Sequence, residues 1–64
     1  MMTLKQLMDE ESADIWEVLP SNYNDREEDE LNACDCLDCE VHDWWMENED
    51  VNQVKIVVSV NVEG

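Results

Sequence analysis

Four potential metal ligands lie within nine residues near the middle of the chain, in the order Cys34-x-Cys36-x-x-Cys39-x-x-His42. Three thiolates and one imidazole have the types and the number for a closed tetrahedral Zn²⁺ site, which can stabilise a domain with a small core. Typical structural sites, however, join two ligand pairs from separate parts of the chain. On a continuous helix, Cys34 would point away from the other ligands unless the backbone turned sharply near Cys36. The pattern therefore leaves two hypotheses open. Either the four residues form a zinc module, or Cys34 and Cys39 are small core residues and Cys36 and His42 are incidental.

The sequence indicates neither a catalytic site nor a calcium site. Cys39 and His42 have the types of a nucleophile and a base, but nothing in the sequence orients the imidazole, and the acidic surroundings disfavour a thiolate. The acids between Asp25 and Asp38 lack the glycine and the spacing of an EF-hand loop. We therefore expect a protein that is not an enzyme and has no cofactor, with zinc as the alternative.

Carboxylates are the most abundant chemical group. The 64 residues contain 18 Asp and Glu against 3 Lys and Arg, a formal net charge of −15. Residues 1–24 carry −4 and residues 51–64 carry zero, whereas residues 25–50 combine twelve acids with one arginine and carry −11. The candidate partner-binding residues are eight of the carboxylates in this middle segment and one tryptophan: Glu27, Glu28, Asp29, Glu30, Asp35, Asp38, Glu40, Asp43 and Trp44.

The excess of negative charge predicts a cationic partner. Direct binding of nucleic acid or of an anionic membrane needs Lys and Arg, which this chain lacks. Carboxylates three or four residues apart on a helix lie about 5–6 Å from one another, close to the spacing of phosphates. We expect an acidic interaction protein that binds and blocks a basic, nucleic-acid-binding surface by mimicry, as phage-type inhibitors do; this is an analogy of class. A solvated surface and adaptation to high salt remain the alternatives.

Length and cysteine usage indicate one small domain, residues 1–64, in the cytoplasm. A chain of 64 residues buries only about 60% of its extended-chain surface. Three cysteines within six residues would close only trivial disulfide loops, so we expect reduced thiols or metal ligands. No stretch has the composition of a signal peptide or the roughly 18 apolar residues of a transmembrane helix.

The first segment predicts an amphipathic helix that runs as far as Pro20. Thr3 followed by Gln6 fits a capping box, and the proline and the polar residues 21–24 mark the end. The expected apolar face follows the i, i+3, i+4 pattern and consists of Leu4, Leu7, Met8, Ile15, Val18 and Leu19.

The second segment predicts an acidic helix that begins at Asp25, with Glu28 completing another capping box. Its apolar residues fall on one helical face, but residues 37–46 also alternate as a half-buried strand does, so both structures stay open there. In a strand, the adjacent Trp44 and Trp45 would face opposite sides, and one of them could anchor a partner.

The third segment predicts a β-strand, because residues 53–62 alternate and are rich in valine and isoleucine. A strand needs a neighbour. It could form a hairpin with residues 39–46, pair with its copy in a homodimer through residues 51–62, or add to a sheet edge of the target. The expected fold class is therefore α+β: an N-terminal amphipathic helix, a second acidic helix and β structure at the C-terminal end.

Overall fold

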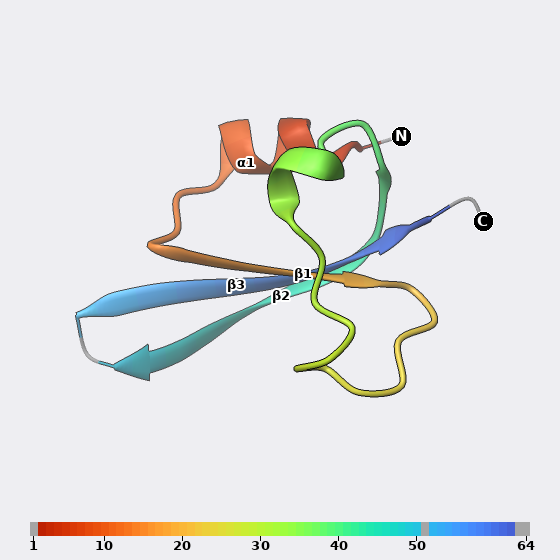
Figure 1. The fold of residues 1–64 in the computed structure, drawn as a ribbon. Coiled ribbons are helices and arrows are strands. Elements are labelled where there is room, and N and C mark those ends of the chain that lie inside the picture. The colour runs from red at the N-terminus through yellow and green to blue at the C-terminus, as the bar shows by residue number, and fades with distance from the viewer. Residues whose placement is uncertain (1, 51, 63–64) are drawn as a thin grey trace.

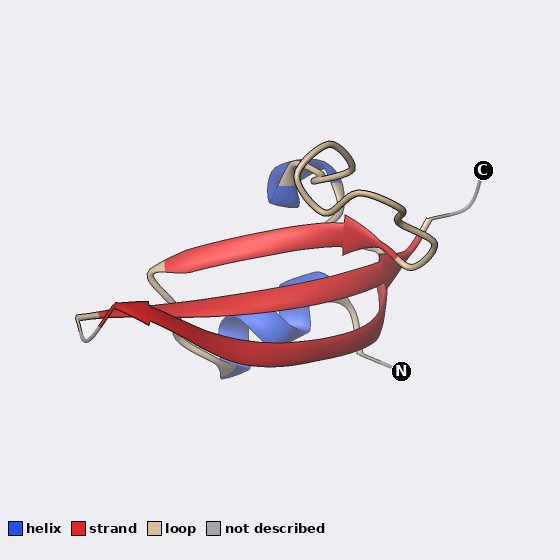
Figure 2. Ribbon diagram, turned by 90° about the horizontal axis from the view of Figure 1, so that it is seen from below, coloured by secondary structure: helices blue, strands red, loops and turns tan. Residues whose placement is uncertain are grey.

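The computed structural model describes residues 2–50 and 52–62. Its elements in chain order are α1 (Leu4–Glu10), β1 (Ile15–Pro20), the 3-10 helix η1 (Ala33–Asp35), β2 (Glu40–Asp50) and β3 (Gln53–Asn61). The strands form one sheet in the order β1-β3-β2, with β1 parallel and β2 antiparallel to β3. Helix α1 covers one face of the sheet (Figure 2), and η1 lies on the same side near β1 (Figure 1).

The central strand is β3, which holds the other two strands together. Its residues 56–60 are all buried, as expected of a strand covered on both faces. One edge pairs with β1, and the other pairs with β2 from Glu40↔Asn61 to Asp50↔Gln53, which is the hairpin among our alternatives. Both edges of β3 are thus paired with strands of the same chain, while a homodimer through residues 51–62 stays a prediction. Val51 itself lies outside the described residues.

The core lies between α1 and the sheet. Leu4 and Leu7 of the helix pack against Val18, Val58 and Val60, and all five are completely buried. Cys36 completes this cluster from the segment that follows η1. Each fully buried leucine or valine side chain contributes about 1.5–3 kcal/mol. A helix as short as α1 is marginal by itself, so the packing of its apolar face against the sheet stabilises it.

The prediction of a helix extending to Leu19 is wrong, although its beginning is confirmed. The Thr3 and Gln6 capping box is present, but α1 has seven residues and ends at Glu10. Asp9 and Glu10 oppose the helix dipole in the last turn, where no basic residue compensates them. No helix in the described part of the chain is long and apolar enough to cross a bilayer.

Residues 15–19 form a strand because β3 offers them an apolar edge. The chain enters β1 through Asp14, whose N–H donates to the Val54 carbonyl at 2.9 Å and whose Oδ2 accepts from the Val54 N–H at 2.9 Å. Pairing then runs from Ile15↔Lys55 to Pro20↔Val60. The proline ends an edge strand, where a missing N–H is tolerated.

The predicted second acidic helix is also wrong, because only its first turn forms. The Asp25 carboxylate accepts from the N–H groups of Glu27 (3.0 Å) and Glu28 (3.4 Å), and the Asp29 N–H donates to the Asp25 carbonyl at 2.8 Å. The chain then extends, and the Leu31 N–H donates to the Val18 carbonyl at 2.7 Å. Repulsion between carboxylates three and four residues apart opposes further helix. The described part of the chain is therefore mostly β, with one short α-helix.

Strand β2 contains an extra residue that explains why this segment fitted two periodicities. Val41 pairs with Val60 but Asp43 pairs with Ser59, so His42 is a bulge. The bulge shifts the alternation by one residue, and Val41 and Trp44 therefore both pack against the core. Two core residues three positions apart imitate a helical face.

Candidate acidic interaction surface

The face of the sheet opposite α1 carries a network of four charged side chains, one from each strand and one from the loop after β1. Arg26 pairs through Nε with Glu17 of β1 and through Nη2 with Glu47 Oε1 of β2, at 2.8 Å. Lys55 Nζ of β3 lies 3.1 Å from Glu17 Oε1. Sequence reasoning missed this network, because its members appear adjacent only when the order of the strands is known.

The pKa shifts of three members of this network, Glu17, Arg26 and Glu47, favour their ionised forms. Partial burial acts to raise the pKa of Glu17, but hydrogen bonds and charges of Arg26 and Lys55 outweigh it and hold the pKa below its ordinary value. Hydrogen bonds from Arg26 and then from Trp45 lower the pKa of Glu47. Glu47 and Glu17 in turn raise the pKa of Arg26. Two carboxylates and two cations thus neutralise each other within the fold.

The eight candidate carboxylates come from three places in the chain and not from one helix. They belong to the turn at residues 25–30, to η1 and the turn after it, and to β2. Exposed residues among them are Glu27, Glu28, Glu30, Asp35, Asp38 and Asp43, and half-buried ones are Asp29 and Glu40. The regular spacing of carboxylates along a helix therefore does not apply to this protein.

The turn at residues 25–29 is fixed by its own carboxylates. Asp29 Oδ2 accepts from the N–H groups of Asn24 at 2.8 Å and Asp25 at 2.9 Å. The backbone hydrogen bonds from Asp25 and Asn24 lower the pKa of Asp29, which favours its ionised form. Asp29 is thus engaged within the loop, whereas Glu27 and Glu28 point to solvent from a defined turn.

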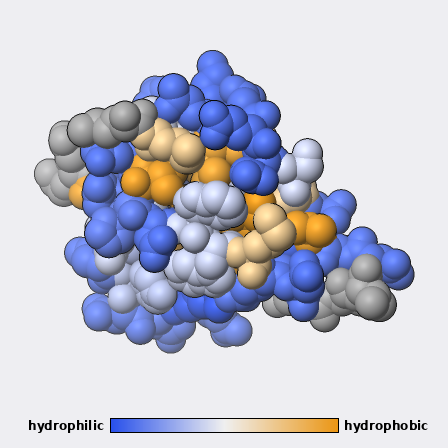
Figure 3. Space-filling model, turned by 180° about the vertical axis from the view of Figure 1, so that it is seen from behind, coloured by the Kyte–Doolittle hydropathy of each residue, from blue (hydrophilic) through white to orange (hydrophobic). Residues whose placement is uncertain are grey.

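The adjacent tryptophans face opposite sides of β2, as expected for a strand. Trp44 is half-buried against the core. Trp45 is half-buried on the other face, where its Nε1 donates to Glu47 Oε2 at 2.7 Å. Neither is among the large exposed apolar side chains of the described residues, which are Tyr23, Met46 and Val62. Figure 3 shows apolar residues reaching the surface on one face of the molecule, with hydrophilic residues around them.

The potential metal ligands lie in different environments. Cys34 is exposed on η1, Cys36 is buried, Cys39 is half-buried against the core, and His42 is exposed at the bulge. Burial raises the pKa of Cys36, with further contributions from Cys39 and Asp35. In the part of the chain that the structure describes, no three His, Cys, Asp or Glu side chains come together to hold a metal ion. Cys36 and Cys39 act here as small apolar residues, so the expectation that Cys34 lies in the core and Cys36 outside it is wrong.

The fold and this surface define a class, a small and strongly acidic domain with a mixed three-stranded sheet. No protein-family model, curated protein or solved structure matches the chain.

Proposed function

We propose that the protein is an acidic interaction protein that binds and blocks the basic, nucleic-acid-binding surface of a partner protein. The observation that supports this most is the pairing of Arg26 and Lys55 with Glu17 and Glu47. Two of the 3 basic residues of the sequence are engaged in ion pairs within the protein, while six of the eight candidate carboxylates are exposed. A protein with this charge distribution attracts cationic surfaces and repels nucleic acid.

Mimicry in this protein depends on the density of its carboxylates and on their fixed positions. Long-range attraction brings the basic surface of the partner close, and carboxylates such as Glu27 and Asp43 then accept hydrogen bonds from its arginines and lysines. The hydrogen bonds that fix the turn at residues 25–29 reduce the ordering cost of binding. We place the protein in the cytoplasm, where clustered thiols such as Cys34 stay reduced.

The experiment captures partners from a cell lysate at low salt and elutes them with a salt gradient. We expect the captured protein to elute between low and moderate salt and to be displaced by duplex DNA. The variant E27Q/E28Q is compared with D9N/E10Q, which removes the same charge from exposed positions on α1. We expect E27Q/E28Q to weaken binding by about tenfold and D9N/E10Q to weaken it much less.

Three outcomes would contradict the proposal. They are binding that does not depend on salt, a captured protein that DNA does not displace, and equal losses in E27Q/E28Q and D9N/E10Q. The last would mean that net charge alone, and no particular surface, determines the binding.

A further inference from the structure

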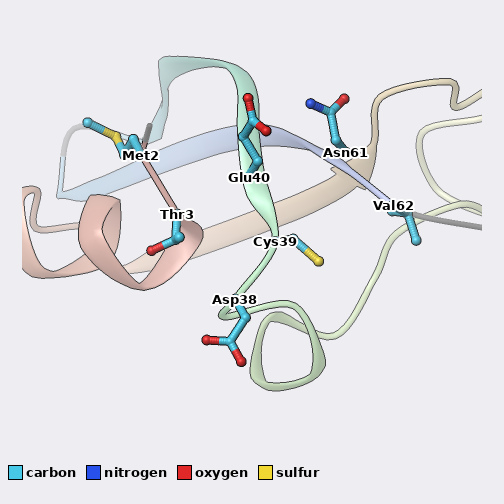
Figure 4. A pocket seen from close by; sticks show the side chains of 7 residues that line it. All are labelled: Met2, Thr3, Asp38, Cys39, Glu40, Asn61 and Val62. Atoms are coloured by element: carbon cyan, nitrogen blue, oxygen red, sulfur yellow. The ribbon is translucent and has the colours of Figure 1, made fainter.

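A hollow of about 570 Å³ lies where the two ends of the described chain meet the start of β2. Residues 2–3, 38–40 and 61–62 line it (Figure 4). This volume lies within the range of about 300–1,000 Å³ that is usual for binding pockets. We call it the terminal hollow.

Backbone hydrogen bonds form the walls of the terminal hollow before any ligand binds. The Leu4 N–H donates to the Cys39 carbonyl at 3.0 Å, and the Val41 N–H donates to the Met2 carbonyl at 2.8 Å. On the other side, β2 begins with the pair Glu40↔Asn61. The hollow is therefore held by backbone hydrogen bonds that join the segment before α1 to the turn before β2 and to the sheet.

The lining combines carboxylates with apolar groups. Asp38 is exposed and Glu40 is half-buried, and their carboxylates point in opposite directions from the chain on either side of Cys39 (Figure 4). Cys39 and Met2 are half-buried, and Val62 is 49% exposed, so apolar surface lies between the two acids. Among the described residues, neither acid takes part in an ion pair, and the lining contains no basic residue.

We propose that the terminal hollow binds an arginine-rich segment of the partner protein, with a guanidinium group at Asp38 and another at Glu40. Arginine combines an apolar stem with five N–H donors, which suits a carboxylate beside apolar surface. The stems lie over Cys39 and Val62, while the charged ends reach the acids. This inference rests on the proposed function and assigns one contact within it.

The probe is a hexa-arginine peptide, and hexa-citrulline, which has a similar shape without the charge, is its control. Binding is followed by the NMR shifts of the backbone amides. We expect hexa-arginine to move the signals of Thr3, Cys39 and Asn61 and hexa-citrulline to leave them in place. We expect D38N/E40Q to lose about tenfold in affinity and D9N/E10Q, with the same change in charge, to lose much less.

A second pair of variants tests the shape of the hollow without changing charge. Val62→Trp adds a large ring at an exposed position of the lining, and we expect it to weaken hexa-arginine binding severalfold. Met46→Trp makes the same kind of change at another exposed position, outside the lining, and we expect it to leave the affinity unchanged.

Equal losses in D38N/E40Q and D9N/E10Q, or full affinity in Val62→Trp, would overturn the terminal hollow as a site. Salt-dependent capture of a partner that needs Glu27 and Glu28 would then still support the proposed function. If the capture shows no dependence on salt or on Glu27 and Glu28, the proposed function fails as well.

Discussion

Glu17 is the carboxylate of the charged network that pairs with both of its cations. It lies on β1 and pairs with both Arg26 and Lys55, and its side chain is only 12% exposed. In a protein of net charge −15, neutralising an average acid relieves repulsion. Neutralising Glu17 also removes two ion pairs. The two effects change the free energy of unfolding in opposite directions. A substitution of Glu17 therefore shows whether local ion pairs or net charge has the larger effect on stability.

We expect Glu17→Gln to lower the free energy of unfolding by about 1 kcal/mol at pH 7. The matched variant Glu27→Gln removes the same charge from an exposed side chain, and we expect it to leave stability unchanged or slightly increased. Urea denaturation of the two variants and of the original protein measures this. If Glu17→Gln stabilises the protein as much as Glu27→Gln does, net charge outweighs the network.

The pH dependence of the Glu17→Gln effect follows from the lowered pKa of Glu17. A carboxyl group whose pKa is lower in the folded state stabilises the fold above its unfolded pKa, and this contribution disappears as the pH falls through the folded pKa. The difference in stability between the original protein and Glu17→Gln should therefore be complete at pH 7, should begin to fall near the ordinary pKa of 4.5, and should vanish only below the lowered pKa of the folded state. A difference that persists in strong acid would contradict this account.

At the scale of the elements, β3 determines which alternatives the neighbouring segments adopt. The N-terminal cap and β3 could be predicted from the sequence, because both depend on adjacent residues. Ile15, Val18 and Leu19 satisfy a helical and an extended pattern alike, and only the edge of β3 decides between them. The bulge at His42 could not be predicted either, since it is defined by pairing with residues far along the chain.

The candidate carboxylates can be chosen from the sequence, but the way in which the fold arranges them cannot. The sequence identifies Glu27 and Glu28 as exposed acids near an Asp25 cap, and the structure shows that capped turn. The sequence does not reveal the network around Arg26 or the terminal hollow, because both join segments that only the sheet brings together. The charge of a segment can be counted from the sequence, whereas the proximity of distant segments depends on the fold.

The capping box of α1 gives a test at this scale. Thr3 Oγ1 accepts from the Gln6 N–H at 3.3 Å, and Gln6 Oε1 accepts from the Thr3 N–H at 3.0 Å. We expect Thr3→Ala to lower the free energy of unfolding by about 1 kcal/mol, because α1 covers the core and loses a cap. Thr3→Ser should keep most of the stability, and Ser12→Ala, at an exposed position beyond the helix, should have little effect. Urea denaturation measures all three, and equal stabilities of Thr3→Ala and Thr3→Ser would contradict the role of the cap.

At the scale of the whole molecule, the range of the repulsion between carboxylates at low salt is comparable to the size of the protein. The molecule measures 37 × 26 × 18 Å. The screening length is about 30 Å at 10 mM salt, about 10 Å at 0.1 M and about 3 Å at 1 M. At low salt, carboxylates on opposite sides therefore repel one another, whereas at high salt only close neighbours interact. The partly buried ion pair of Lys55 with Glu17 is screened less than the exposed acids are.

We expect added NaCl to raise the thermal stability of the protein. Between 10 mM and 500 mM NaCl the melting temperature should increase by about 5 °C, which corresponds to about 1 kcal/mol for a chain of this size. Circular dichroism follows the transition, and sucrose at equal osmolality controls for effects that do not involve charge. A melting temperature that falls with salt would show that the ion pairs outweigh the repulsion.

The order of the strands has a consequence for biosynthesis. Strands β1 and β2 are joined through β3, which is the last of the three to be translated. When residues 1–52 have left the ribosome, β1 and β2 are both present but neither has its pairing partner. The sheet therefore assembles only after residues 53–61 emerge. Until then, the dense carboxylates keep the nascent segments apart from one another and from other chains, so the charge that we assign to recognition also protects the protein while it is being made.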